Sequence, residues 1–269
     1  MPADTLLHDV WSAGHPYERY VGRWSRAVAL QFVDWLGVPP NQRWLDVGCG
    51  TGSVTQAILE RATPAGVTGI DPSEGFIAVA RGQTNDARAM FRVGDALALP
   101  VDDGACDAAV SGLMLNFIPD PAQAVAEMKR SVRPGGTVAL YLWDYAAGMQ
   151  LIRRFWDAAI ALDPAARDLA EGRRCPICQP QPLRALLETA GLVQVQNRAI
   201  EIPTVFTDFD DYWSPFLGGQ GPAPSYCGSL PDDHQARLRE RLRASLPTAP
   251  DGTIRLTASA FAVRAIRPD

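Results

Sequence analysis

Lysine is almost absent from this sequence of 269 residues, in which Lys129 is the only one. Arginine supplies the rest of the 25 basic side chains, and 30 acidic side chains leave a formal net charge of −5. A protein that binds nucleic acid over a wide surface concentrates positive charge there. The composition therefore predicts no nucleic-acid partner.

Long apolar runs are also missing, and no uninterrupted stretch is long enough to cross a bilayer. The first twenty residues lack the basic start and apolar core that are typical of a secretory signal. We therefore expect neither a membrane-spanning segment nor export, and we expect the protein to be cytoplasmic.

Cysteines are few and odd in number: Cys49, Cys106, Cys175, Cys178 and Cys227. An odd, scattered set is typical of reduced thiols rather than of a disulfide framework. The stretch "CPIC" (175–178) has the spacing of half a zinc site, and Cys227 and His234 could complete four ligands, but these two lack the spacing of a second pair. We expect no metal.

Strand and helix patterns alternate five times between residues 43 and 143. The apolar strand candidates are residues 43–47, 66–71, 87–96, 106–112 and 137–143, and helical patterns connect them. Alternation with short connections predicts parallel strands with right-handed crossovers and helices on both faces.

The rest of the chain adds an amphipathic helix over residues 17–36 and two later strands, 192–202 and 253–263. Two irregular segments rich in aromatic residues lie between these parts, and we interpret them as insertions in one domain, 1–269. The predicted parts are an N-terminal helical cap (1–37), a cofactor-binding core (38–145), a helical insertion (146–182), the rest of the core sheet (183–202 and 253–266) and a lid insertion (203–250).

A glycine-rich turn, "LDVGCGTG" (45–52), follows the first strand of the alternating region. Glycine lets a ligand approach the backbone closely, and the following helix N-terminus favours an anionic group. A tight turn without a ligand is the alternative. Asp46, Asp71 and Asp95 each lie at the end of a strand, at one edge of the predicted sheet, where open α/β folds bind ligands. Three aligned acids favour a nucleoside site.

These motifs together resemble the class I S-adenosylmethionine-dependent methyltransferases that act on small molecules. The resemblance rests on "LDVGCGTG", "GIDPSEGFIAVAR", "FRVGDALALP", "CDAAVSGLMLNFIPDP" and "RPGGTVALYLWDY", in this order from residue 43 to about 145. It implies a doubly wound, mostly parallel, Rossmann-like α/β sheet of seven strands, the last one antiparallel, with an N-terminal helical cap and a lid insertion.

The resemblance also implies which residues hold S-adenosylmethionine. Asp46 would orient the amino group of its methionine part, Asp71 would bind the ribose hydroxyls, and Asp95 would accept the adenine amine. Tyr20 and Arg23 would meet the carboxylate, although a packed surface helix explains them equally well. The full set is Tyr20, Arg23, Asp46, Gly48, Gly50, Gly52, Asp71, Pro72, Ser73, Asp95, Ala96, Ser111 and Leu113.

The activity implied is methyl transfer to a small molecule by in-line displacement, in which the enzyme acts mainly by positioning. A general base is needed only if the acceptor loses a proton. Candidates are Asp144, Tyr145 and His234, with loop structure or a helix N-cap as the alternative roles.

Eight aromatic residues of the insertions suggest an apolar or aromatic acceptor, since small-molecule pockets are mostly apolar. They are Phe155, Trp156, Phe206, Phe209, Tyr212, Trp213, Phe216 and Tyr226. A small core formed by the same rings is the alternative.

Two other functions also fit a glycine turn followed by an acid. A nicotinamide-dependent oxidoreductase normally carries G-x-G-x-x-G, whereas this turn is G-x-G-x-G. A non-catalytic S-adenosylmethionine-binding protein would keep the cofactor motifs without turnover. The sequence leaves the oligomeric state open.

Overall fold

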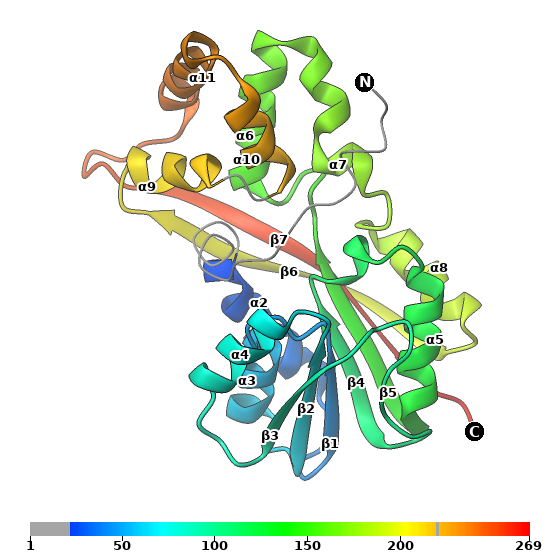
Figure 1. Ribbon diagram of the computed structural model, residues 1–269. Coiled ribbons are helices and arrows are strands. Elements are labelled where there is room, and N and C mark those ends of the chain that lie inside the picture. Colours follow the sequence, from blue (N-terminus) through cyan, green and yellow to red (C-terminus); the bar gives the residue numbers. More distant parts are fainter. Residues whose placement is uncertain (1–21, 219–220) are drawn as a thin grey trace. The chain divides into compact units, whose positions relative to one another are not determined.

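A computed structural model describes residues 22–218 and 221–269 (Figure 1). The described chain divides into two compact units. The first unit comprises residues 22–23, Asp144–Pro176 and Glu201–Ala258. The second comprises Trp24–Trp143, Ile177–Ile200 and Ser259–Asp269. The predicted division into cap, core and insertions stays a prediction.

The seven strands form one mostly parallel sheet in the order β3-β2-β1-β4-β5-β7-β6. The strands are β1 (Arg43–Val47), β2 (Gly66–Asp71), β3 (Ala89–Val93), β4 (Cys106–Gly112), β5 (Val132–Trp143), β6 (Val193–Phe206) and β7 (Ile254–Ile266). β1 to β5 pair in parallel, whereas β7 pairs with β5 in the antiparallel direction. The predicted fold class, including the antiparallel last strand, is confirmed.

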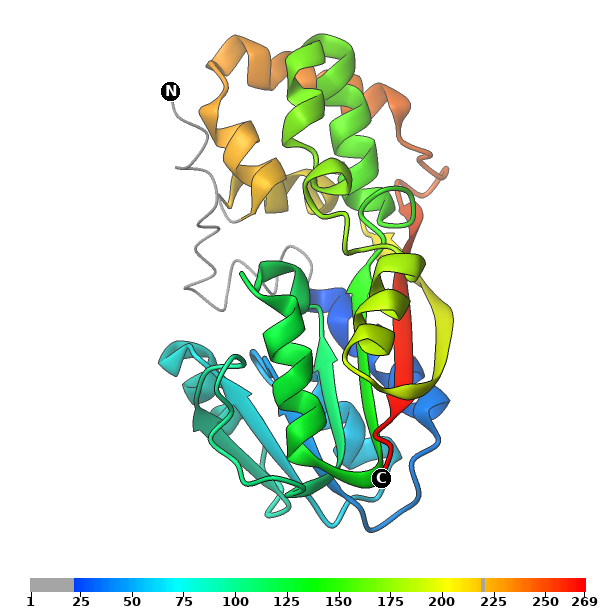
Figure 2. The ribbon, with the colours of Figure 1, turned by 90° about the vertical axis from the view of Figure 1, so that its right-hand side faces the viewer.

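The helices of the second unit cover both faces of this sheet (Figure 2). They are α2 (Arg23–Leu36), α3 (Ser53–Arg61), α4 (Glu74–Gln83), α5 (Pro121–Ser131) and α8 (Pro180–Thr189). The chain moves outward from β1 in one direction through α3 and α4, and in the other through α5. Because such crossovers are right-handed, α3 and α4 lie on the opposite face from α5.

Local sequence explains where these helices begin. Ser73 caps α4, because its hydroxyl accepts the Phe76 N–H at 3.2 Å. Asp120 caps α5 in the same way through the N–H of Gln123, and Pro121 follows at the first helical position. The caps fix the connections that follow β2 and β4, and so the carboxyl edge of the sheet.

Several elements differ from the sequence-based bounds. β3 is shorter than residues 87–96, because a tight turn closed by a bridge between Asp95 and Ala98 follows it, and β5 begins at Val132 rather than at 137. β6 and β7 extend beyond residues 202 and 263, where the sequence-based strands end. α2 begins at Arg23, while the first part of the predicted helix 17–36 lies outside the described residues.

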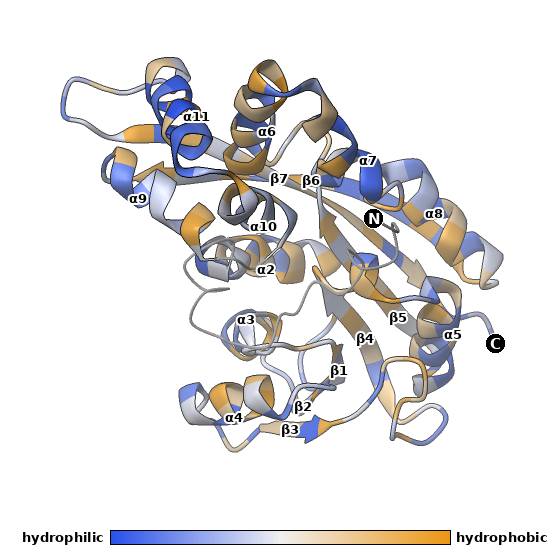
Figure 3. Ribbon diagram, turned by 45° about the horizontal axis from the view of Figure 1, so that its top comes forward, coloured by the Kyte–Doolittle hydropathy of each residue, from blue (hydrophilic) through white to orange (hydrophobic). Residues whose placement is uncertain are grey.

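The first unit is largely helical. Its helices are α6 (Gln150–Leu162), η4 (Pro164–Leu169), α7 (Glu171–Arg174), α9 (Phe209–Trp213), η5 (Ser214–Leu217), α10 (Pro222–Ser229) and α11 (Asp232–Ser245). In Figure 3, α11 is mostly hydrophilic, as expected for a helix that faces solvent on most sides. Among the described residues, no helix is long and apolar enough to span a membrane.

The single lysine joins two helices of the second unit. Its ammonium group donates to the carbonyl oxygens of Ala190, at 2.7 Å, and Gly191, at 3.3 Å. Both carbonyls lie just beyond the C-terminus of α8, where backbone acceptors lack helical partners. Lys129 on α5 therefore caps α8 from a neighbouring element.

Candidate cofactor-binding site

The glycine-rich turn has a backbone that only glycine adopts without strain. Gly48, Gly50 and Gly52 have φ angles of 70°, 53° and 95°. A side chain at any of the three positions would therefore be strained. The N–H groups of Gly48 and Cys49 both donate to the Ile70 carbonyl, at 2.8 and 3.0 Å, and fix the turn to the end of β2. The spacing of three glycines thus has a conformational cause.

Asp71 holds the turn from the end of β2. One carboxylate oxygen accepts the N–H of Gly50 at 3.0 Å, and the other accepts the N–H of Ser73 at 2.9 Å. Burial raises the pKa of this carboxyl group, while the two N–H donors act in the opposite direction. Each oxygen keeps a second lone pair, so Asp71 can still accept two hydroxyl groups from a ligand.

Asp46 lies in β1, directly before the turn, and is fully buried. Its Oδ2 accepts the hydroxyl of Thr55 at 2.7 Å, but its Oδ1 has no hydrogen-bond partner among the described residues. Burial, opposed by the bonds from Thr55 and reinforced by the charge of Asp71, raises the pKa of Asp46 to about 7. A buried carboxylate oxygen without a donor is costly, and a cationic amino group would relieve that cost.

Ser111 provides a second unsatisfied atom, on the strand that neighbours the strand of Asp46. The two residues lie on neighbouring strands, since Asp46 pairs with Val110 in the β1–β4 register. The Ser111 hydroxyl is buried and has no hydrogen-bond partner among the described residues. Two buried polar atoms that lack partners, each near the carboxyl end of one of two neighbouring strands, point to a polar ligand at this edge of the sheet.

The first residue after β4, at the same edge of the sheet, has a strained backbone conformation. Leu113 has a φ of 61°, which is costly for a side chain of this kind, and its N–H donates to the Tyr141 carbonyl at 2.9 Å. Met114 lies over the turn, since a Cβ built on Gly48 would come within 2.3 Å of its side chain. A Cβ on Gly50 would meet no described atom within 4 Å, so the described part of the chain leaves open space beside the middle of the turn.

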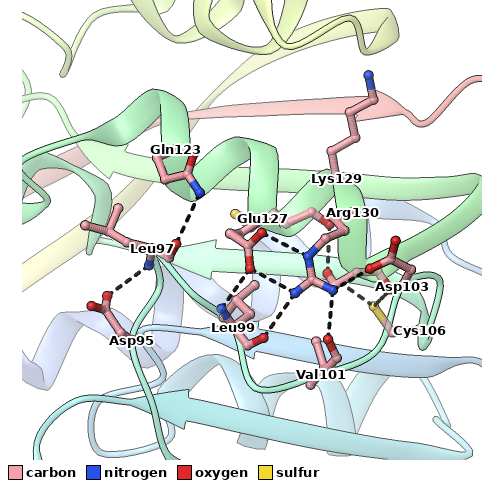
Figure 4. A network of polar contacts seen from close by, with 12 residues as sticks. Asp95, Leu97, Leu99, Val101, Asp103, Cys106, Gln123, Glu127, Lys129 and Arg130 are labelled. Carbon is pink, nitrogen blue, oxygen red and sulfur yellow. Dashed lines mark hydrogen bonds and ion pairs between the residues drawn. The ribbon is translucent and has the colours of Figure 1, made fainter.

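Asp95 and Ala96 lie in the loop between β3 and β4, residues 94–105, which we call the strap. Asp95 is exposed and accepts the N–H of Leu97 at 2.9 Å, while Ala96 is buried. Figure 4 shows the strap against α5, where Gln123 donates to the Leu97 carbonyl at 3.2 Å.

Arg130 of α5 is the main anchor of the strap (Figure 4). Its guanidinium group donates to the carbonyls of Val101 (2.8 Å) and Leu99 (3.0 Å) and to the carboxylate of Asp103 (2.7 Å). Two further bonds reach Glu127, and Arg130 lowers the pKa of that carboxyl group by donating to it. The network places the backbone that carries Asp95.

Replacing Arg130 by lysine is expected to lower the free energy of unfolding by about 1–3 kcal/mol. Lysine keeps the charge but cannot serve several acceptors in one plane. Arg88→Lys is the matched control, because Arg88 pairs with Asp86 at an exposed site, and it should change stability by less than about 0.5 kcal/mol. Urea unfolding measures both, and equal effects would contradict the anchoring role.

The described residues fit the adenosyl donor that the sequence implies. An unpaired buried carboxylate oxygen, an unpaired hydroxyl, open space beside Gly50 and spare acceptor capacity on Asp71 all lie at one edge of the second unit. Asp46 and Ser111 match the methionine end, and Asp71 matches a ribose. Pro72 and Ser73 directly follow Asp71. The role of each residue toward the cofactor stays a prediction.

Two further candidates from the sequence are not among the described residues of the second unit. Tyr20 is outside the described residues. Arg23 belongs to the first unit, where it forms an ion pair of 2.7 Å with Asp211 and its guanidinium carbon lies 5.2 Å from the centroid of the Phe206 ring.

The three candidates for proton transfer also belong to the first unit. Asp144 accepts the N–H groups of Ala146 and Ala147, both at 3.1 Å, and so stabilises the turn after β5. Tyr145 is half-buried. His234 is exposed in the first turn of α11, and its Nε2 lies 3.8 Å from the carboxylate of Asp233. No catalytic base is assigned from these contacts.

The aromatic residues predicted to line an acceptor pocket are mostly core residues of the first unit. Seven of the eight are buried, and Phe155 stacks on Phe216 with centroids 4.4 Å apart. The Tyr212 hydroxyl donates to the Leu151 carbonyl at 2.9 Å. These seven rings therefore fit the alternative interpretation, in which they form a small core. Of the eight, only Tyr226 is half-buried.

Sequence reasoning missed several residues that shape the site. Thr55, Met114 and Arg130 act through contacts that no short motif contains. It also missed Glu171, a buried acid of the first unit whose carboxylate accepts the Trp156 indole N–H. Burial raises the pKa of Glu171 to about 7. Among the described residues, no group of three potential metal ligands gathers.

Comparison with known proteins gives a consistent picture. The family described as "Methyltransferase domain" matches residues 45–140. A demethylmenaquinone methyltransferase of Staphylococcus aureus is 29% identical over 176 residues, which are 61% of this chain and 73% of that enzyme. An uncharacterised transposon protein of Streptomyces fradiae is 36% identical over 118 residues, 43% of this chain. The match spans only 34% of that relative.

Solved structures share the fold. The YcgJ protein of Bacillus subtilis has a TM-score of 0.60 at 16% identity, over 90% of this chain and 99% of that one. A phosphoethanolamine N-methyltransferase of Haemonchus contortus, solved with S-adenosylhomocysteine, has a TM-score of 0.58 at 16% identity. The alignment covers 95% of this chain and 57% of the Haemonchus chain.

Proposed function

We propose that this chain transfers the methyl group of S-adenosylmethionine to a small apolar or aromatic acceptor, a proposal supported by the match of residues 45–140 to a methyltransferase domain. The observation that supports the proposal is Asp46 Oδ1, a fully buried carboxylate oxygen just before the glycine-rich turn that has no hydrogen-bond partner among the described residues. When bound, the cofactor supplies a methyl group on a positively charged sulfur.

We propose that the chain contributes mainly by binding and orientation. Asp46 and Ser111 would hold the amino end of the cofactor, and Asp71 would fix the ribose through two hydrogen bonds. The turn would keep these groups in one geometry, because its hydrogen bonds to the Ile70 carbonyl and to the Asp71 carboxylate hold it in place. Orientation of this kind accounts for about 7–11 kcal/mol of a barrier in favourable cases.

The acceptor class is supported by a relative. The S. aureus enzyme is named for demethylmenaquinone, a quinone, and its alignment covers 73% of its length. Five cysteines that are all free thiols support the further proposal of a cytoplasmic protein.

Ligand-induced thermal shifts test the cofactor directly. We expect S-adenosylhomocysteine to raise the melting temperature by several degrees, since binding at 100 times Kd stabilises by about 2.7 kcal/mol. NAD should leave it unchanged. Stabilisation by NAD alone would make the chain an oxidoreductase instead. Transfer of a labelled methyl group to a quinol or a phenol then tests turnover, and cofactor binding with no transfer to any small acceptor would indicate a binding protein.

A further inference from the structure

The first unit contains a pocket of about 250 Å³ that none of the proposed steps uses. The end of α6, the end of α10 and the beginning of α11 surround it, and these helices lie together in Figures 1 and 2. Its apolar part is formed by Ala159, Leu162, Leu230 and Leu238, of which Ala159 and Leu238 are buried. The volume suits a molecule somewhat smaller than a drug-sized ligand.

Tyr226 forms an aromatic wall of this pocket. Its ring packs against the indole of Trp156, with centroids 5.3 Å apart, and edge-on against Phe155 at 6.3 Å. Trp156 is held in turn by the buried carboxylate of Glu171. The Tyr226 ring is therefore fixed from behind, and it offers a flat surface to a second ring.

Arg237 lies at the rim and is available to a ligand. Among the described residues, it has no hydrogen-bond or ion-pair partner, whereas Arg239 and Arg243 on the same helix both pair with Asp210 and Glu240. Its planar guanidinium group matches the two oxygens of a carboxylate. His234, three residues earlier on α11, lies on the same side of the pocket.

Asp163 lies on the α6 side of the same pocket. One oxygen of its carboxylate accepts the Ala165 N–H at 3.0 Å, so the other oxygen can accept from a ligand. Burial and then the charge of Asp163 raise the pKa of Tyr226, which keeps its hydroxyl protonated and able to donate. The pocket thus has a cationic side on α11 and an accepting side on α6.

We propose that this pocket binds a small aromatic carboxylate that carries a hydroxyl group at the far end of its ring. The ring would lie on Tyr226 and the apolar floor, the carboxylate would pair with Arg237, and the hydroxyl would donate to Asp163. This is a binding site in its own right, and its test does not depend on methyl transfer.

Isothermal titration calorimetry with 4-hydroxybenzoate tests the proposal on the full chain, with 4-hydroxybenzamide as the neutral probe of the same shape. We expect a Kd of about 1 mM or below for the acid and binding about tenfold weaker or more for the amide, since the charge-assisted pair is lost. Arg237→Gln should weaken binding of the acid by a similar factor. Arg241→Gln, a substitution on the same exposed helix but outside the pocket, should leave it unchanged.

Two results would overturn the proposal: no binding of the acid up to about 10 mM, or equal binding of acid and amide. Equal effects of Arg237→Gln and Arg241→Gln would also overturn it, because they would reflect the overall charge of α11. Circular dichroism and the melting temperature show that each variant is folded. Binding of S-adenosylhomocysteine, measured separately, distinguishes failure here from failure of the proposed function.

Discussion

Asp71→Ala is expected to weaken the binding of S-adenosylhomocysteine by about 100-fold or more. Hydrogen bonds to a charged group contribute about 1.5–3 kcal/mol each, and the proposed site gives Asp71 two ribose hydroxyls. The substitution also leaves the N–H groups of Gly50 and Ser73 without their acceptor. The loss therefore combines a direct contact with a loosened turn.

Calorimetry at a temperature well below the melting midpoint measures this effect without interference from unfolding. Asp71→Asn keeps one acceptor and should fall between the wild type and Asp71→Ala. Asp86→Ala is the control, since Asp86 pairs with Arg88 in an exposed loop of the same unit. Wild-type affinity in Asp71→Ala would place the ribose elsewhere and remove the central contact of the proposed site.

Asp46→Asn is expected to remove a pH dependence from both stability and cofactor binding. The folded protein holds a proton on Asp46 up to a pKa of about 7, whereas the unfolded chain loses it near the ordinary aspartate pKa of 3.8. Between these values the folded state binds more protons, so the free energy of unfolding falls as pH rises. From pH 5 to pH 8, the ionisation of Asp46 alone lowers the free energy of unfolding by on the order of 2 kcal/mol.

The pH dependence of cofactor binding is opposite to that of stability. A cationic amino group favours the ionised form of Asp46, so the affinity of the wild type should rise about tenfold between pH 6 and pH 8. Asp46→Asn should bind weakly and with little dependence on pH.

Urea unfolding at pH 5 and pH 8 checks the stability effect, and calorimetry at pH 6 and pH 8 checks binding. Glu171, whose pKa is also raised to about 7, contributes to stability with the same sign. The difference between wild type and Asp46→Asn therefore isolates Asp46. An identical pH slope in the two proteins would show that Asp46 ionises as an ordinary surface acid.

The cofactor core was predictable because its signals are local. β1, β2 and β4 have the bounds expected from the sequence, since turn residues flank short apolar runs. The cap at Ser73 follows from its own side chain. The three glycines in the turn likewise report their backbone conformation directly.

The environment of the same residues was not predictable. The missing partner of Asp46 Oδ1 depends on its neighbours in space, which no motif specifies. The anchoring of the strap by Arg130 joins residues about thirty positions apart, and nothing in "EMKR" distinguishes this arginine from a solvated one. Non-local contacts of this kind decide pKa values and rigidity.

The first unit shows more clearly that amino-acid composition alone does not predict a ligand pocket. Density of aromatic residues suggested an acceptor pocket, but most of those rings fill the interior of a small helical unit. Burial and ligand binding favour the same residue types, so composition cannot separate them. Arg237 and Asp163, which give the pocket at Tyr226 its polarity, are ordinary exposed residues in the sequence.

The cap that Lys129 provides for α8 has a consequence for chemical modification. Because no other side chain carries a primary amine, acylating reagents have one internal target, and that target is engaged with two backbone carbonyls. Its reaction rate should follow the opening of the contact between α5 and α8. The rate at which mass spectrometry detects the single acylated peptide would then measure how often the contact between α5 and α8 opens.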